Sequence, residues 1–172
     1  MRFLIVLALC GVLFGQSSPK SDIWEPVRFL VGTWEGEVSG QPGTGKSERE
    51  YRFALKGKFL EIRNKSVYPA QPKNPKGETH EDWGMISYNR ATKKFVLRQF
   101  HVEGFVNQFV GEVRADKSVQ FVSESIENIP AGYRARETYT IISANEFVER
   151  FEMADPGKDF EVYSETRFKR KN

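Results

Sequence analysis

The chain has 172 residues, with 26 Lys or Arg and 23 Asp or Glu, which gives a formal net charge of +3. This length is ample for one domain and small for two. Acidic and basic residues are interspersed, and the basic run at 167–171 is explained most simply as a solvated strand end. The sequence therefore does not predict a nucleic-acid-binding protein.

The first 17 residues are predicted to be a secretory signal peptide. Arg2 precedes the uncharged apolar run 3–14, and small residues suited to cleavage follow at 15–17. The run is short for a membrane span, so we expect no stable membrane insertion and a secreted or periplasmic location. The mature domain would then comprise residues 18–172. The only cysteine, Cys10, lies in the signal, so this domain must fold without a disulfide.

Residues 24–32 are predicted to form one short helix, because Pro26 suits its first turn and Gly32 suits its end. After Gly32, apolar residues alternate with polar ones at the period of two that is typical of strands. The predicted strands cover residues 34–39, 50–55, 59–67, 83–88, 95–102, 105–113, 119–126, 138–142, 147–153 and 160–168. The connections are short, except for the polar segment 69–79, which we expect at the surface, as a possible flap over a barrel mouth.

Short connections imply antiparallel neighbours, and closure of a ten-stranded sheet removes its exposed edges. The predicted fold is therefore all-β: a single antiparallel up-and-down barrel of about ten strands with a short N-terminal helix. A two-sheet sandwich is the alternative. Aromatic residues lie mostly on the strands. We expect some in the core and the others along an apolar pocket, and the predicted core residues are Trp34, Phe59, Trp83 and Phe95.

Residues 40–47 match the phosphate-binding pattern G-x-x-x-x-G-K-[ST]. A phosphate-binding loop must lead into a helix whose N-terminal N–H groups hold the phosphates. Here Ser47 leads into residues of strand period, and no crossover helices follow. We interpret the match as a chance one within a hairpin, and a nucleotide hydrolase is not expected.

Few residues suggest a functional site. His80 is expected to be solvated. His101 lies on a strand and is a candidate ligand for a metal, a haem or a polar molecule. Because no cluster at ligand spacing accompanies His101, no metal site is expected.

Arg98 and Arg150 alternate within apolar strands, where either could face inward and bind a ligand carboxylate or face outward. No nucleophile with a base is evident, so no catalysis is expected. The tripeptide at 64–66 fits a glycosylation sequon, beginning at Asn64.

The segment 29–37 contains Gly32, Trp34 and Gly36, which we interpret as a barrel-closing motif. It resembles the opening of nitrobindin-like proteins and the Gly-x-Trp start of lipocalins and fatty-acid-binding proteins. The likeness continues through 57–62 and 83–88 to the Phe-rich strands that end at Phe168. This resemblance implies a ten-stranded calycin-like barrel with a small apolar cavity, of a kind common among secreted bacterial proteins.

The resemblance also bears on cofactors. Nitrobindins hold haem through a histidine on one of the last strands, but this sequence has no histidine after His101. The Arg-x-Tyr clamp of fatty-acid-binding proteins is missing from 163–168. We therefore expect no cofactor and a barrel that binds a small apolar or amphipathic molecule in its interior. The alternative is a haem-binding barrel that acts on reactive nitrogen species, with His101 as a non-standard ligand.

Overall fold

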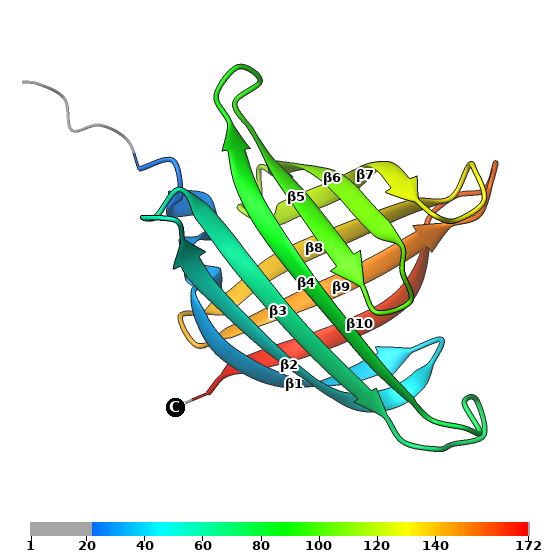
Figure 1. The fold of residues 1–172 in the computed structure, drawn as a ribbon. Coiled ribbons are helices and arrows are strands. Elements are labelled where there is room, and N and C mark those ends of the chain that lie inside the picture. Colours follow the sequence, from blue (N-terminus) through cyan, green and yellow to red (C-terminus); the bar gives the residue numbers. More distant parts are fainter. Residues whose placement is uncertain (1–21, 172) are drawn as a thin grey trace, which may run out of the picture.

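The computed structural model describes residues 22–171, so the predicted signal peptide lies outside the described residues. A short 3-10 helix, η1 (Glu25–Leu30), is followed by ten strands (Figure 1). The strands are β1 (Gly32–Gly40), β2 (Gly43–Ala54), β3 (Phe59–Tyr68), β4 (Glu78–Asn89), β5 (Lys94–His101), β6 (Val106–Val113), β7 (Val119–Glu127), β8 (Arg134–Ser143), β9 (Glu146–Ala154) and β10 (Glu161–Arg170). Among these residues, no helix is long and apolar enough to cross a bilayer.

The strands form one closed barrel in which each strand pairs with its neighbours in the sequence and β1 pairs with β10. All ten pairings are antiparallel. This confirms the predicted up-and-down barrel and excludes the two-sheet sandwich. In Figure 1, η1 covers one end of the barrel, and the hairpin between β1 and β2 lies at the opposite end.

The barrel is locked where its first and last strands meet. Trp34 is fully buried and stands opposite Arg170 in the β1–β10 register. Its indole Nε1 donates to the Leu30 carbonyl (2.6 Å), and the Arg170 guanidinium lies 4.1 Å from the centre of its ring. Arg170 also donates to the carbonyls of Val31 (2.8 Å) and Phe29 (3.2 Å). The pair Trp34 and Arg170 thus joins β1, β10 and the C-terminal end of η1.

The two glycines of the predicted motif allow this close packing. Gly32 has a φ of 133° and lies against the Arg170 side chain, where a Cβ would collide with the guanidinium. At Gly36, a Cβ would lie 2.5 Å from the carbonyl oxygen of Arg167 on β10. Both positions therefore require glycine for a structural reason.

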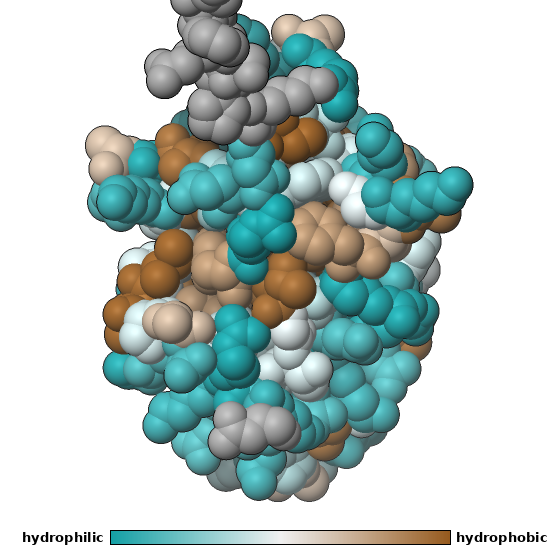
Figure 2. All heavy atoms as spheres, turned by 90° about the vertical axis from the view of Figure 1, so that its left-hand side faces the viewer, coloured by the Kyte–Doolittle hydropathy of each residue, from teal (hydrophilic) through white to brown (hydrophobic). Residues whose placement is uncertain are grey.

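The half of the interior next to η1 is apolar. Its fully buried side chains include Leu30, Trp34, Tyr51, Leu60, Ile62, Ile86, Leu97, Phe109, Phe121, Tyr139, Phe147 and Phe168. Trp24 completes this core from the helix side, where it packs on Phe53 and Phe95. Figure 2 views the covered end and shows apolar side chains gathered around its centre within a polar frame. The core is thus closed at this end by the helix.

The predicted core is only partly correct. Trp34 and Phe95 are buried, and Phe59 is half-buried. Trp83 is 39% exposed: it packs against Phe100 on the outside of the barrel, and its Nε1 donates to Glu61 (2.9 Å). The prediction for Trp83 is wrong because its strand neighbours point inward, which places Trp83 on the outer face.

Two connections lie side by side at the open end of the barrel. The segment 40–47 forms the β1–β2 hairpin and runs on into β2, with Gly40 opposite Gly43. No helix follows it, so the structure supports a chance match to the phosphate-binding pattern. The loop before β4 lies beside this hairpin, because Gln71 accepts from the Thr44 N–H (2.9 Å). It therefore braces the rim of the open end.

Replacing Trp34 with Ala should lower the free energy of unfolding by about 3–5 kcal/mol, as large aromatic truncations in cores do. Trp83→Ala is the matched control on the outer face and should cost no more than about 1–2 kcal/mol. Urea unfolding of the two variants provides the comparison. Equal losses would show that Trp34 does not lock the barrel.

Candidate functional site: an acidic cavity in the open half of the barrel

The half of the barrel away from η1 encloses a cavity of about 410 Å³. Its deeper wall is polar and its mouth is largely apolar. The polar lining residues are Ser47, Arg49, Asn64, Ser66, Glu78, His80, Asp82, Gln99, His101, Glu103, Asn107, Glu137, Glu149, Ser164 and Thr166. The apolar and aromatic ones are Val38, Pro42, Tyr68, Phe105, Ile126, Ile129, Ala135, Phe151, Met153 and Tyr163. The expectation of an apolar pocket is therefore wrong for its deeper part.

The change from an apolar to a polar interior occurs within single strands. In β3, the inward side chains are Leu60 and Ile62 near the covered end, then Asn64 and Ser66 further on. Gln99 follows Leu97 in β5 in the same way. Alternation is kept throughout, but the inward residues change chemistry halfway along the strand. The sequence of each strand thus places polar side chains in the open half of the interior without breaking the alternation.

A buried ion pair crosses the cavity floor. Arg49 on β2 donates to Glu149 Oε1 on β9 (2.6 Å), although β1 and β10 lie between these strands. Both side chains are more than nine-tenths buried. Burying two charges is costly unless their remaining polar atoms are satisfied, and here Arg49 Nε and Nη1 and Glu149 Oε2 have no protein partner.

A second buried carboxyl lies nearby. Glu137 is buried on β8 and accepts from the Tyr139 hydroxyl (2.5 Å). Burial raises the pKa of Glu137, and it also raises the pKa of Glu149 to about 8 against the opposing charge of Arg49. Burial therefore outweighs the ion pair at Glu149, and the ionised form of both carboxyl groups on the cavity floor is disfavoured.

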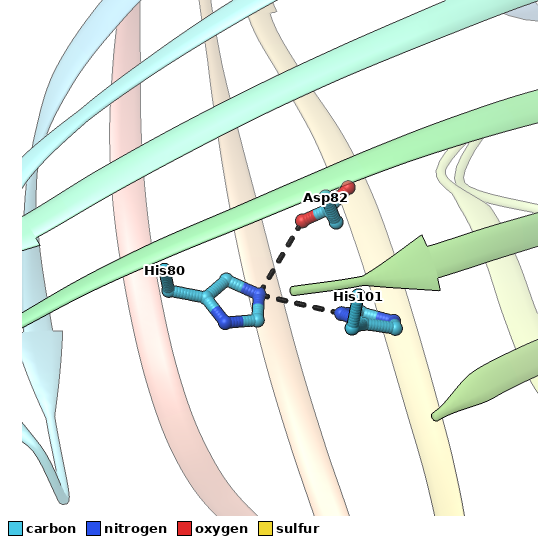
Figure 3. Close-up of side chains that lie close together, drawn as sticks. All are labelled: His80, Asp82 and His101. Carbon is cyan, nitrogen blue, oxygen red and sulfur yellow. Dashed lines mark hydrogen bonds and ion pairs between the residues drawn. The ribbon is translucent and has the colours of Figure 1, made fainter. Parts of the chain in front are cut away.

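Two histidines and an aspartate converge at the side of the cavity (Figure 3). His80 Nε2 lies 3.5 Å from Asp82 Oδ2 and 3.3 Å from His101 Nδ1. Asp82 and His101 are direct partners in the β4–β5 register, and His80 stands two residues before Asp82 on the same face. Phe105 stacks on the His101 ring at 4.0 Å between centroids and fixes its plane.

The two rings differ in charge. Burial alone would lower the pKa of His80, but its bonds to Asp82 and Glu103 outweigh burial and raise it to about 9. Burial dominates at His101 and lowers its pKa to about 4. The pKa of Asp82 is lowered because bonds and charges from His80, Arg49 and Asn64 outweigh its burial. At neutral pH, a charged His80 thus faces a neutral His101.

Six buried polar atoms of cavity residues have no protein partner. They are Arg49 Nε and Nη1, Asp82 Oδ1, Gln99 Oε1, Asn107 Oδ1 and Glu149 Oε2. Three of the six, on Asp82, Gln99 and Asn107, are oxygens that accept hydrogen bonds, and Glu149 Oε2 accepts one when Glu149 is ionised. Buried polar groups in folded proteins are nearly always satisfied, so this cavity is suited to a guest that donates hydrogen bonds.

The structure brings one of the three predicted ligand-binding residues to the site. His101 lines the cavity, whereas Arg98 and Arg150 are exposed on the outer face, where Arg150 pairs with Glu165 (2.8 Å). Of the two alternatives left open by the sequence, the structure shows the outward one for both arginines, since their strand neighbours Gln99 and Glu149 face inward instead. The predicted sequon asparagine, Asn64, is buried and donates to Asp82 (2.7 Å).

Sequence reasoning missed Arg49, Asp82, Gln99 and Glu149, and it placed His80 in solvent. The available signal was that Arg49, Gln99 and Glu149 each stand two positions from an inward apolar residue in the same strand. That signal identifies the face of a strand, but not which strands meet across the barrel.

The fold and cavity define the chain as a calycin-type β-barrel with a polar interior site. A family model described as a THAP4-like, heme-binding beta-barrel domain matches residues 24–170, so the chain belongs to that family. This confirms the nitrobindin-like resemblance. No protein with a curated description matches.

One solved structure supports the fold: Rv2717c from M. tuberculosis is 17% identical, with a TM-score of 0.66, over 88% of this chain and 99% of that one. Two designed barrels are more distant. A redesigned beta barrel, mFAP0, bound to DFHBI, is 10% identical, with a TM-score of 0.47, over 83% of this chain and all of the other. A de novo designed fluorescence-activating beta barrel is 16% identical, with a TM-score of 0.43, over 84% of this chain and 95% of the other.

The residues of this cavity do not fit haem. The only histidine candidates are His80 and His101, because the sequence has no others. The His101 Nδ1 faces His80, and its Nε2 faces the Asn107 amide (3.1 Å), so His101 could bind an iron only if one of these neighbours rotated away. The adjoining wall carries buried carboxyl groups in place of the apolar surface that a porphyrin needs.

Replacing Glu149 with Gln tests whether the burial of Glu149 affects its pKa more strongly than the charge of Arg49 does. A carboxyl whose pKa is near 8 when folded and near 4.5 when unfolded keeps a proton in the folded state, so its contribution to stability falls as pH rises from about 4.5 to 8. Glu149→Gln removes this loss, so the free energy of unfolding of the variant should rise by about 1–3 kcal/mol relative to that of the wild type between pH 5 and pH 8. Urea unfolding across this range measures the difference.

The matched control is Glu165→Gln on the outer face, which should show no such pH-dependent gain. A loss of about 3–5 kcal/mol in Glu149→Gln at every pH would contradict the expectation. It would mean that Arg49 keeps Glu149 ionised throughout.

Proposed function

We propose that this protein binds a small amphipathic molecule whose polar end donates hydrogen bonds and carries no negative charge. The observation that carries the proposal is the set of three unpartnered acceptor oxygens, on Asp82, Gln99 and Asn107, that face one cavity. A donor-rich end, such as an amine, an amide or a hydroxyl, complements these oxygens. A carboxylate end does not.

The charges around the cavity support this choice. Five carboxyl side chains line it, against one arginine and two histidines. One nitrogen of the arginine, Nη2, already bonds to Glu149, which leaves Nε and Nη1 of Arg49 as the unpartnered donors of the cavity. An anionic guest would be repelled by the remaining carboxylates, whereas a neutral or cationic guest would not.

The mouth supports an apolar remainder of the ligand. Phe105, Ile126, Phe151 and Tyr163 line it and are only half-buried. Apolar surface left partly exposed around a concave opening is the usual setting for an apolar ligand segment. We therefore retain the amphipathic ligand that the sequence predicts, and we propose that its polar end lies against the deeper, polar wall of the cavity.

A displacement assay tests the proposal with three ligands of equal chain length. The neutral dye Nile red is displaced by dodecylamine, dodecanol or dodecanoate, each below its micellar concentration and in the presence of EDTA. The amine and the alcohol should displace the dye at micromolar concentrations. The carboxylate should bind at least about tenfold more weakly, a difference of about 1.4 kcal/mol.

Two neighbouring residues of β5 provide the matched variants. Gln99→Ala removes an inward acceptor and should weaken binding of the amine. Arg98→Ala changes an outward residue and should leave it unchanged. Dodecanoate binding as tightly as dodecylamine would contradict the proposal, and so would a loss of dodecanoate binding in Arg98→Ala.

A further inference from the structure

We propose that His80, Asp82 and His101 bind a divalent transition-metal ion of the zinc type at the side of the cavity. The inference goes beyond the proposed function and does not rest on it, since it concerns three side chains and an ion that need no organic ligand. The three groups lie on the inner face of adjacent strands, β4 and β5, where the barrel holds them firmly.

The spacing of the donor atoms suits a metal. At a tetrahedral zinc ion with bonds of about 2.0–2.1 Å, two ligand atoms lie about 3.3–3.4 Å apart. His80 Nε2 lies 3.3 Å from His101 Nδ1 and 3.5 Å from Asp82 Oδ2. All three residues offer ligand atoms within 4.8 Å of one another. The side chains therefore need only small rotations to enclose an ion.

The groups behind the ligands are arranged as they are in metal sites. The other ring nitrogen of His80, Nδ1, lies 2.8 Å from Glu103 Oε1, which forms the carboxylate–histidine arrangement that orients metal ligands. The other nitrogen of His101, Nε2, faces the Asn107 amide, whose oxygen has no partner. Rotation of that amide would let Nε2–H donate to the oxygen and leave Nδ1 free to bind the ion.

Asp82 gives an independent indication of a cation. Its side chain is only 3% exposed, yet its Oδ1 has no hydrogen-bond partner. Its Oδ2 accepts from Asn64, which holds the carboxylate in place (2.7 Å). A buried carboxylate oxygen without a partner is costly, and a bound cation would satisfy it.

The donor set narrows the class of ion. Two imidazoles and one carboxylate with an open position are typical of catalytic zinc and non-haem iron sites, whereas calcium and magnesium prefer oxygen donors. His101 and Asp82 both line the cavity. The open position would therefore face the cavity, where water or another small ligand could complete the coordination.

The test uses untagged protein, treated with EDTA and transferred to metal-free buffer without any organic ligand. Co²⁺ is titrated as a spectroscopic probe and Zn²⁺ by calorimetry. We expect one equivalent of each, micromolar or tighter binding of Zn²⁺, and visible Co²⁺ bands that differ from those of the aqueous ion. Mg²⁺ at the same concentration should not displace Co²⁺.

Variants assign the site. His101→Ala and His80→Ala should each weaken Zn²⁺ binding by more than about 100-fold, whereas Glu103→Gln should weaken it by about 10–100-fold. Glu81→Gln is the matched control, because Glu81 neighbours Asp82 but lies outside and pairs with Lys65 (2.8 Å). It should bind like wild type. Circular dichroism and thermal unfolding confirm that each variant is folded.

Two results would overturn the proposal. One is a Co²⁺ spectrum at one equivalent that is identical to that of the aqueous ion. The other is Zn²⁺ binding that persists unchanged in both histidine variants, which would place the ion on surface carboxylates. Because the dodecylamine assay is run in EDTA and this one without dodecylamine, failure of either leaves the other result standing.

Discussion

The pairing of β1 with β10 is the constraint on which the rest of the structure depends. Side chains alternate along a strand, so a slip of one residue at this seam would turn the inward side chains of the slipped strand outward and prevent the barrel from closing in register. Trp34 and Arg170 prevent that slip, because they stand opposite each other and both bond to the carbonyls that lead out of η1. The seam therefore decides which residues face the cavity as well as whether the barrel closes.

The two halves of the interior have different roles, stabilisation in one and the polar cavity in the other. The half next to η1 buries large apolar side chains and supplies most of the hydrophobic stabilisation. The open half buries Arg49, Glu137 and Glu149, whose desolvation is unfavourable for folding. Such an arrangement persists only when the rest of the structure holds it, and strained or costly groups of this kind gather at functional sites. The polar half is therefore best understood as a binding site supported by the apolar half.

The fold was predictable from the sequence, whereas most of the site was not. The period of two and the short turns predict the barrel, and the segment 29–37 identifies the seam. The site depends on contacts between distant residues: Arg49 meets Glu149 a hundred positions later, and His80 meets His101 because of the β4–β5 register. Strand β4 also begins at Glu78, earlier than its apolar pattern indicates, so His80 lies within a strand rather than in a polar loop.

We propose that the carboxyl groups and unpartnered acceptor oxygens of the interior favour ligands that donate hydrogen bonds or carry positive charge, although the family is described as heme-binding. Native mass spectrometry of the protein isolated from its own host, with a denaturing spectrum for comparison, tests this claim most directly. The account predicts an added mass that corresponds to a divalent metal, to a neutral or basic organic molecule, or to both. Protein that retains haem or a fatty acid as its main bound species would contradict it.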